Sequence, residues 1–303
     1  MANTNWTAAN IADQTGKNIL ITGSNSGLGL EAATVLSKKG ATVIMAVRNL
    51  EKGKEAVALI KNKVPNAKLE LMQLDLGDLN SIRKFSDQFH AKYTQLDVLI
   101  NNAGIMLPLK REVTKQGFEI QFGTNHLGHF ALTGLLLDLI KKTPGARVAT
   151  QSSIMHKVGA DIHFDDLNWE KSYNNSKAYA QSKLANLLFT YELDRQFKAH
   201  NINATATAGH PGYTDTNLQR TSGFLVGIMN KLVAQHVEIG TLPILMAATE
   251  KGNVGGNYYG PTKMMETRGY PEKVKSSDKS NDKQMAEKLW QVSEKLTGVH
   301  YNF

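Results

Sequence analysis

The 303-residue sequence contains no cysteine. Disulfide frameworks, thiolate zinc sites and cysteine nucleophiles are therefore excluded. Long apolar runs are also lacking, because the longest, residues 130–140, is interrupted by Thr133 and Asp138 and is too short to span a bilayer. The first residues, MANTNWTAAN, show no basic start followed by an apolar run. We therefore expect neither a secretion signal nor a membrane anchor, and we expect a cytoplasmic protein.

No basic cluster interleaved with aromatic residues is found, although the net charge is +8 and the pI is near 9.4. The lysines are scattered along expected helices, so we predict no nucleic-acid partner. The charge is interpreted as a solvated surface that also attracts a phosphorylated ligand. No repeat or linker divides the chain, so residues 1–303 are expected to form one domain. The polar stretch 273–283 is interpreted as a solvated connection before a last helix at 285–296.

Short runs rich in aliphatic and β-branched residues alternate with segments of helical spacing. Near-continuous apolar strands are typical of parallel strands that are covered by helices on both faces. The pattern predicts an α/β protein: a doubly wound Rossmann fold with a mainly parallel sheet of about seven strands. The expected strands cover residues 18–22, 42–47, 69–74, 96–101, 147–151 and 202–206, with a seventh near 257–259.

A glycine-rich turn, TGSNSGLG, stands between the first strand and its helix. Its glycines permit a tight turn, let the backbone approach a pyrophosphate, and leave the helix amides facing negative charge. Alone, such a turn could be an ordinary loop, but strand, turn and helix occur here in the order that a dinucleotide site requires. The expected cofactor-binding residues of the turn are Gly23, Ser24, Asn25, Ser26, Gly27, Leu28 and Gly29.

The second strand ends without an acidic residue. An acid there would accept hydrogen bonds from a ribose hydroxyl and repel a 2′-phosphate. Arg48 stands in its place, followed by Asn49, with Lys52 one turn further on. A guanidinium suits phosphate geometry and keeps its charge. Although Arg48 could be an ordinary surface residue, the sequence favours NADP(H) over NAD(H) as the cofactor.

These features belong to a longer series of motifs. In chain order they are TGSNSGLG, Asp75-Leu76, NNAG at 101–104, Ser152-Ser153, YAQSK at 179–183 and Pro211-Gly212. Over nearly the whole chain the series resembles the short-chain dehydrogenase/reductase superfamily. NHLGHF, AYAQSKLANLLF and LWQVSEKLTG further resemble the branch of retinol dehydrogenases and protochlorophyllide reductases. The resemblance implies an oxidoreductase acting on an alcohol or carbonyl substrate, and a homo-oligomer, either a dimer or a tetramer.

The resemblance also implies further contacts to the cofactor. The implied residues are Asp75 and Leu76 beside the adenine, Asn102, Ala103 and Gly104 beside the ribose, and Pro211, Gly212, Thr214 and Thr216 near the nicotinamide carboxamide.

A tyrosine followed four residues later by a lysine occurs twice within residues 172–186. Residues at i and i+4 share one helix face only if both lie inside the helix. The Asn-Asn-Ser segment 174–176 is poor in a helix interior but suits an N-terminal cap, so the helix is expected to begin near residue 176. Tyr179 and Lys183 then lie inside the helix, and Tyr173 precedes it.

Reducing a carbonyl requires a hydride on carbon and a proton on oxygen. A free phenol has a pKa of about 10, and an adjacent ammonium is expected to lower it, which would make Tyr179 beside Lys183 an effective acid. The resemblance implies that Lys183 also holds the nicotinamide ribose, that Ser153 polarises the carbonyl with Ser152 in support, and that Asn125 holds a proton-relay water. The expected catalytic residues are Asn125, Ser153, Tyr179 and Lys183.

Two segments near the site are expected to cover it. Residues 154–174 connect Ser153 to the helix of Tyr179. This connection is longer than is usual in the superfamily that the sequence resembles, and it is predicted to form a small flap. Residues 213–236 carry apolar residues at helical spacing and are predicted to form a substrate lid, which favours a substrate with an apolar body. Packing on the core, on a partner subunit or on a membrane surface remain alternatives for this second segment.

Two further possibilities concern the chemistry of the site. His126 and His129 stand at helical spacing but have no third ligand at a suitable distance in the sequence, so no metal site is expected. A non-catalytic sensor of the NADP(H) ratio is the alternative function. A sensor would be expected to have lost a catalytic residue, and all four are present.

Overall fold

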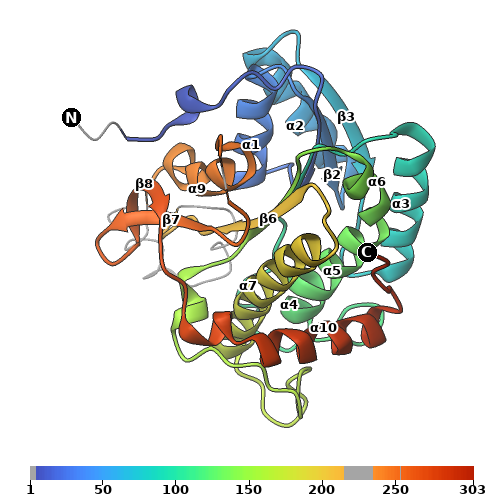
Figure 1. Cartoon of the computed structure of the whole chain (residues 1–303), viewed down its shortest axis with the longest axis vertical. Helices are drawn as coiled ribbons and strands as arrows, with labels where there is room; N and C mark the ends of the chain where they lie inside the picture. The colour runs from blue at the N-terminus through green and yellow to red at the C-terminus, as the bar shows by residue number, and fades with distance from the viewer. Residues whose placement is uncertain (1–4, 215–234, 253) are drawn as a thin grey trace.

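The computed structural model describes residues 5–214, 235–252 and 254–303. Within these residues, eight strands form one sheet in the order β3-β2-β1-β4-β5-β6-β7-β8 (Figure 1). Strands β1 to β7 are parallel, and β8 is antiparallel to β7. The strands are β1 Asn18–Thr22, β2 Thr42–Val47, β3 Lys68–Gln73, β4 Val98–Asn101, β5 Ala146–Gln151, β6 Ala204–Gly209, β7 Tyr258–Lys263 and β8 Arg268–Lys273. The predicted doubly wound, mainly parallel sheet is confirmed.

The sheet differs from the prediction at one edge. Strand β6 starts and ends later than the expected 202–206, and β8 was not expected at all. Its sequence, RGYPEK, lacks an apolar run and contains Pro271, which cannot donate to a ladder and is tolerated because β8 is an edge strand. The predicted solvated connection after it contains a 3-10 helix, η5 Asp278–Asn281, whose Ser280 is buried.

Helices cover both faces of the sheet. Alternate residues of a strand point to opposite faces, so Leu20 packs in one core cluster while Ile19 and Ile21 pack in the other. The first cluster contains residues of α3 Leu79–Lys92, α5 Gly128–Leu135, α6 Leu137–Lys142 and α7 Asn175–Ala199. The second contains residues of α1 Gly27–Lys38, α2 Leu50–Lys63 and α9 Val237–Thr249. No helix in the described part of the chain is long and apolar enough to cross a membrane.

Helix α7 carries the tyrosine–lysine pairs identified in the sequence. It begins at Asn175, one residue before the predicted start, and the Oδ1 atom of Asn174 accepts a hydrogen bond from the backbone N–H of Lys177 at 2.9 Å. Helix α10, Lys283–Thr297, lies across α7 at the C-terminal end of the chain (Figure 1). The predicted helix at 285–296 is thereby confirmed.

The remaining helical segments are short. They are the 3-10 helices η1 Ala8–Asn10 and η3 Ile154–Lys157, the single turn α4 Ile120–Phe122, and the π-helix η2 Gly123–Leu127 that leads directly into α5.

Candidate active site

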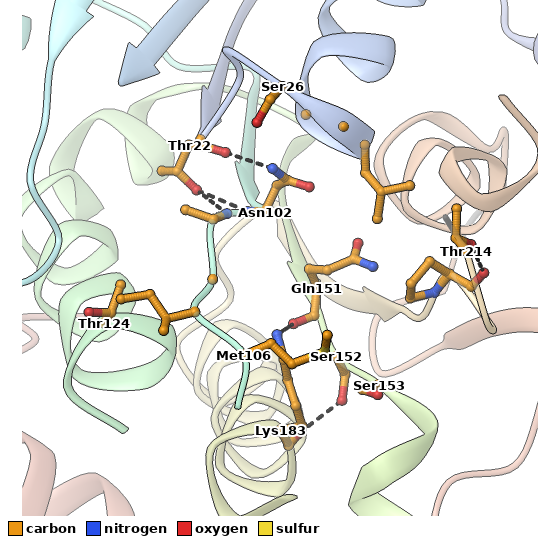
Figure 2. Close-up of a pocket in the computed structure, with 18 of the residues that line it drawn as sticks. Thr22, Ser26, Asn102, Met106, Thr124, Gln151, Ser152, Ser153, Lys183 and Thr214 are labelled. Atoms are coloured by element: carbon orange, nitrogen blue, oxygen red, sulfur yellow. Dashed lines mark hydrogen bonds between the residues drawn. The ribbon is translucent and has the colours of Figure 1, made fainter. Parts of the chain in front are cut away.

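A cavity of about 640 Å³ opens where the parallel strands end, and Figure 2 shows part of its lining. The carboxyl ends of such strands are where ligands bind in open α/β sheets. Most of the residues predicted from the sequence line this cavity: Gly23, Asn25, Ser26, Gly27, Leu28, Gly29, Arg48, Asp75, Leu76, Asn102, Ala103, Gly104, Ser153, Tyr179, Lys183, Pro211, Gly212 and Thr214.

Four predicted site residues are placed elsewhere or are not described. Ser24 is fully buried and does not line the cavity. Asn49 caps α2, since its Oδ1 atom accepts a hydrogen bond from the backbone N–H of Lys52 at 3.0 Å. Asn125 lies behind the cavity wall. Thr216 lies outside the described residues.

The glycine-rich turn has the geometry of an anion site. Gly23 has a φ of +65°, and a Cβ atom on Gly29 would lie only 2.4 Å from the Gly23 carbonyl oxygen. Close backbone packing therefore requires glycine at both positions. The side chain of Ser26 makes no capping hydrogen bond to α1, which leaves the amides of the first helical turn without a side-chain partner. These features fit a pyrophosphate at the N-terminus of α1.

Hydrogen bonds hold Asn102 and Ala103 against the end of β1, and Figure 2 shows Asn102 beside Thr22. The hydroxyl of Thr22 accepts hydrogen bonds from both of their backbone N–H groups at 2.9 Å, and the Asn102 side-chain amide donates to the Thr22 carbonyl at 2.8 Å. The NNAG segment is thus held against the glycine-rich turn, where a ribose between the two would contact its backbone.

Arg48 lines the cavity beyond the end of β2, and its side chain is exposed. Within the described part of the chain, no hydrogen bond or ion pair of its guanidinium is found. Lys52, which follows on α2, does not line the cavity. Because the Arg48 guanidinium makes no such contact with the described residues, it can bind an anionic group of a ligand in the cavity.

Tyr179 and Lys183 face the cavity together from α7. The Lys183 ammonium lies 5.5 Å from the centroid of the Tyr179 ring and donates a hydrogen bond to the Gln151 carbonyl at 3.3 Å. The hydroxyl of Ser152 donates to the backbone oxygen of Lys183 at 2.9 Å. Ser152 therefore ties the end of β5 to α7, which agrees with the supporting position expected for it.

Burial sets the protonation of this pair. It raises the pKa of Tyr179 to about 12, although a hydrogen bond with Ser153 lowers that pKa in part. It lowers the pKa of Lys183 to about 8. The expected lowering of the Tyr179 pKa is therefore wrong for the protein alone, because burial penalises the charged phenolate.

Tyr173, the other candidate tyrosine, does not line the cavity. Its hydroxyl donates to Glu119 at 3.3 Å and accepts from the Gln121 side-chain amide at 3.4 Å. Burial together with the nearby Glu119 carboxylate raises the pKa of Tyr173. Lys177 is exposed on α7. The structure therefore brings one of the two tyrosine–lysine pairs to the cavity and leaves the other outside it.

Asn125 sits in the π-helix η2, a type of irregularity that is frequent at functional sites. Its side chain bonds the backbone of Ile105 twice, accepting from the N–H at 2.7 Å and donating to the carbonyl at 2.9 Å. It also donates to Ser182 at 3.0 Å. A Cβ atom on Gly104 would lie 3.3 Å from Asn125 Oδ1 and 3.6 Å from Lys183 Nζ. Asn125 thus holds the loop that packs against Lys183, and its water-relay role stays a prediction.

The two histidines of NHLGHF are buried and hydrogen-bonded inside the fold. His126 Nε2 lies 2.9 Å from the Ser293 hydroxyl, and His129 Nε2 lies 2.9 Å from the Thr22 hydroxyl. Among the described residues, no group of three or more His, Asp or Glu side chains is arranged to hold a metal ion.

Comparison with known proteins agrees with this arrangement. Residues 17–223 match the family model for short chain dehydrogenases. The chain belongs to this family. Retinol dehydrogenase 14 of Homo sapiens is 40% identical over 306 residues, with 94% of this chain and 87% of the relative covered. A solved protein from Mycobacterium paratuberculosis shares 40% identity with a TM-score of 0.84, over 99% of this chain and 100% of that one. The resemblance to the retinol dehydrogenase branch is confirmed.

More distant structures of the family share the fold alone. A short chain dehydrogenase from Shigella flexneri, solved as a complex with NADP, is 22% identical with a TM-score of 0.65, over 81% of this chain and 97% of that one.

Of the two segments predicted to cover the site, residues 154–174 are described in full and residues 213–236 only at their ends. Of residues 154–174, Ile154 and Met155 line the cavity, while Ala160 and Ile162 pack in a core cluster with residues of α7 and α10. The flap stays a prediction. The predicted lid falls largely on residues 215–234, which lie outside the described residues, and Tyr213 and Thr214 before it line the cavity.

Several residues that line the cavity were not predicted from the sequence. Those not expected include Thr22, Ile105, Met106, Leu107, Gln151, Met155 and Thr267. The residues after Gly104 and Ser153 follow expected site motifs directly, so their position in the chain could have indicated them. Thr267 could not have been found, because it follows β7 and reaches the cavity only through the unpredicted β7–β8 hairpin.

Proposed function

We propose that the protein is an NADP(H)-dependent oxidoreductase that transfers a hydride between nicotinamide and an alcohol or carbonyl group of a substrate with an apolar body. One observation carries the proposal. A single cavity contains the glycine-rich turn after β1 and Arg48 after β2, together with Ser153 after β5 and Tyr179 and Lys183 on α7. This combines a site for a phosphorylated dinucleotide with a set of proton-transfer groups.

The cofactor would be held along the whole cavity. The free amides at the start of α1 would bind the pyrophosphate, and Arg48 would bind a 2′-phosphate on the adenosine ribose. Lys183 would hold the nicotinamide ribose, and the turn after β6, which contains Pro211 and Gly212, would face the carboxamide. When bound, the nicotinamide supplies the hydride, and the protein contributes orientation and electrostatics.

Tyr179 would be the proton donor in carbonyl reduction. With a pKa of about 12 its phenol keeps its proton at neutral pH, and the Ser153 hydroxyl beside it would donate a hydrogen bond to the substrate oxygen. Lys183, with a pKa of about 8, remains largely charged at neutral pH. Its ammonium would stabilise the phenolate that forms as the proton leaves Tyr179.

The expected apolar body of the substrate rests on the lining near the proton-transfer groups. Ile154 and Met155 follow Ser153, and Met106 and Leu107 follow the Gly104 loop that packs against Lys183. Two relatives that are 37% and 40% identical to this chain are named for retinol, an apolar alcohol. Both observations favour a substrate whose reactive carbon carries a hydrocarbon chain or ring.

The proposal is tested by following NADPH oxidation against a panel of aldehydes, ketones and quinones, with NADH in parallel. Turnover that depends on NADPH and improves with the length of the apolar substituent is expected. Tight NADPH binding without turnover on any member of the panel would instead support the NADP(H) sensor.

The two tyrosines supply a matched pair of variants. Tyr179→Phe is expected to lower turnover by about a thousandfold, because a general acid contributes about 10²–10⁴ and Tyr179 is the phenol paired with Lys183 on α7. NADPH affinity should change little. Tyr173→Phe removes the same hydroxyl outside the cavity and should leave turnover within about twofold of the starting protein. A reversed result would move the proton donor to Tyr173 and contradict the proposed mechanism.

A further inference from the structure

Gln151, the last residue of β5, has a side-chain amide without a partner. It lines the cavity and is 5% exposed, yet among the described residues neither its Nε2 nor its Oε1 atom makes a hydrogen bond. A buried primary amide offers two donors and an acceptor, and leaving them unpaired costs free energy. A polar side chain kept in this condition at a cavity wall indicates a ligand that satisfies it.

The backbone of Gln151 is held in place, so its side chain starts from a fixed point at the end of β5. Its carbonyl accepts hydrogen bonds from Lys183 Nζ at 3.3 Å and from the Asn186 side-chain amide at 3.0 Å, both on α7. Figure 2 shows the amide of Gln151 in the open space between Asn102 and Thr214, with no dashed line to either. Its position is therefore set by the sheet and α7, and its polar end is left for the cavity.

The position of Gln151 in the sheet indicates which part of a ligand it would meet. It pairs in register with Gly209 at the end of β6, two residues before the turn at Pro211 that lines the cavity. Its backbone carbonyl accepts the hydrogen bond from Lys183. If the nicotinamide ribose lies at Lys183 and the carboxamide faces the Pro211 turn, as proposed above, Gln151 stands beside the carboxamide.

We propose that the Gln151 side chain binds the carboxamide of the nicotinamide through paired hydrogen bonds. Gln151 Nε2 would donate to the carboxamide oxygen, and Gln151 Oε1 would accept from the carboxamide nitrogen, because two primary amides are complementary in this way. The inference rests on the proposed function only in requiring that a nicotinamide dinucleotide binds in this cavity. It assigns to Gln151 a part in fixing which face of the nicotinamide meets the substrate.

The test compares Gln151→Met with the unchanged protein, since methionine is similar in length and apolar. The free protein should melt at the same temperature or higher, because an unpaired buried amide has been removed. The dissociation constant for NADP+, measured by titration calorimetry, should rise about tenfold. Gln151→Leu should give the same melting temperature and the same rise in the dissociation constant. Agreement of the two variants would show that the effect does not come from poor packing of one substituted side chain.

An analogue of the cofactor isolates the hydrogen bonds from other effects. In the 3-acetylpyridine analogue of NADP+ a methyl group replaces the carboxamide nitrogen, so the bond to Gln151 Oε1 cannot form. The unchanged protein should bind this analogue more weakly than NADP+, and Gln151→Met should lose less affinity for it than for NADP+ itself.

Thr150→Val supplies the control on the same strand. The Thr150 hydroxyl is also buried without a partner among the described residues, but Thr150 does not line the cavity. The substitution should raise the melting temperature or leave it unchanged, with the affinity for NADP+ unaffected.

The outcomes separate this inference from the proposed function. If NADP+ binds Gln151→Met as tightly as it binds the unchanged protein, the carboxamide contact is overturned while the proposed function stands. A variant with unchanged NADP+ affinity and a raised KM for the carbonyl substrate would place the amide against the substrate and also overturn the inference. If the unchanged protein binds neither NADP+ nor NAD+, the proposed function fails and this inference fails with it.

Discussion

His129 Nδ1 donates a hydrogen bond to the backbone carbonyl of Asn125 at 2.9 Å, one turn earlier in the chain. The ring is neutral, because burial lowers the pKa of His129 to about 4, so its Nε2 atom accepts from the Thr22 hydroxyl at 2.9 Å. Thr22 in turn accepts the N–H groups of Asn102 and Ala103. A single neutral imidazole therefore connects the glycine-rich turn to the π-helix that carries Asn125.

His129→Phe should disturb both ends of this connection. The Thr22 hydroxyl and the Asn125 carbonyl would lose a buried partner, so the free energy of unfolding is expected to fall by about 2 kcal/mol or more in denaturant titrations. Because Asn125 holds the loop beside Lys183, kcat should also fall, by about tenfold, measured well below the melting temperature.

The control is His126→Phe, one turn earlier. His126 is equally buried but bonds Ser293, away from the cavity. The His126→Phe variant should lose a comparable free energy of unfolding and keep its kcat. An equal loss of kcat in both variants would show that His129 acts only through general stability.

The rate of carbonyl reduction should depend on pH through Lys183. The lysine is charged below its pKa of about 8 and neutral above it, whereas Tyr179, with a pKa of about 12, keeps its proton throughout the neutral range. Reduction needs both the phenol proton and the ammonium, so kcat/KM should be level below about pH 8 and decline above it. Lys183→Arg, whose guanidinium does not titrate in this range, should be slower but lose the decline. A kcat/KM that increases above pH 8 would contradict this assignment.

Stability should fall in acid because burial lowers the pKa of four histidines of the described residues, namely His126, His129, His156 and His210. Burial lowers the pKa of His126 to about 3, and those of His129 and His156 to about 4. An unfolded histidine has a pKa of about 6.5, so the unfolded chain takes up protons first as the pH falls. Their contribution is fully present above about pH 6.5 and is lost progressively toward about pH 4.

The melting temperature, followed between about pH 7 and about pH 4.5, should decrease over this range. His129→Phe should show a shallower decrease, since one of these buried groups is removed. A melting temperature that stays constant down to pH 4.5 would contradict the neutral burial of these side chains.

The doubly wound fold and the ends of most elements followed from local patterns in the sequence. Runs such as Asn18–Thr22 are apolar because both faces of the sheet are covered, and the Asn-Asn-Ser segment fixed the start of α7 to within one residue. Strand β8 was not predicted, because an edge strand needs no apolar run and tolerates proline.

Features that depend on contacts between distant parts of the chain could not be predicted from the sequence. The pKa of Tyr179 depends on how deeply α7 holds the phenol, and the partner of His129 lies at the end of β1, far away in the chain. The free amide of Gln151 could be recognised only after its register and its neighbours on α7 were known. Local periodicity determines elements, whereas burial and pairing at the site arise when the elements pack.

Arg48 supplies the test of cofactor preference. Its guanidinium lines the cavity after β2, where an acid would serve NAD(H) by accepting from the ribose hydroxyls. Arg48→Asp removes the charge that would pair with a 2′-phosphate and adds one that repels it. The dissociation constant for NADPH, measured by fluorescence titration, should therefore rise about a hundredfold, while that for NADH should stay the same or fall.

Lys52→Asp is the matched control, because it makes the same change of charge on α2 outside the cavity lining. It should weaken NADPH binding by less than about threefold, and less still at high salt, since only screened long-range attraction is lost. If Arg48→Asp and Lys52→Asp weakened NADPH binding equally, Arg48 would have no direct contact with the phosphate. The preference for NADPH would then arise from the overall positive charge of the surface, and the specific role proposed for Arg48 would be wrong.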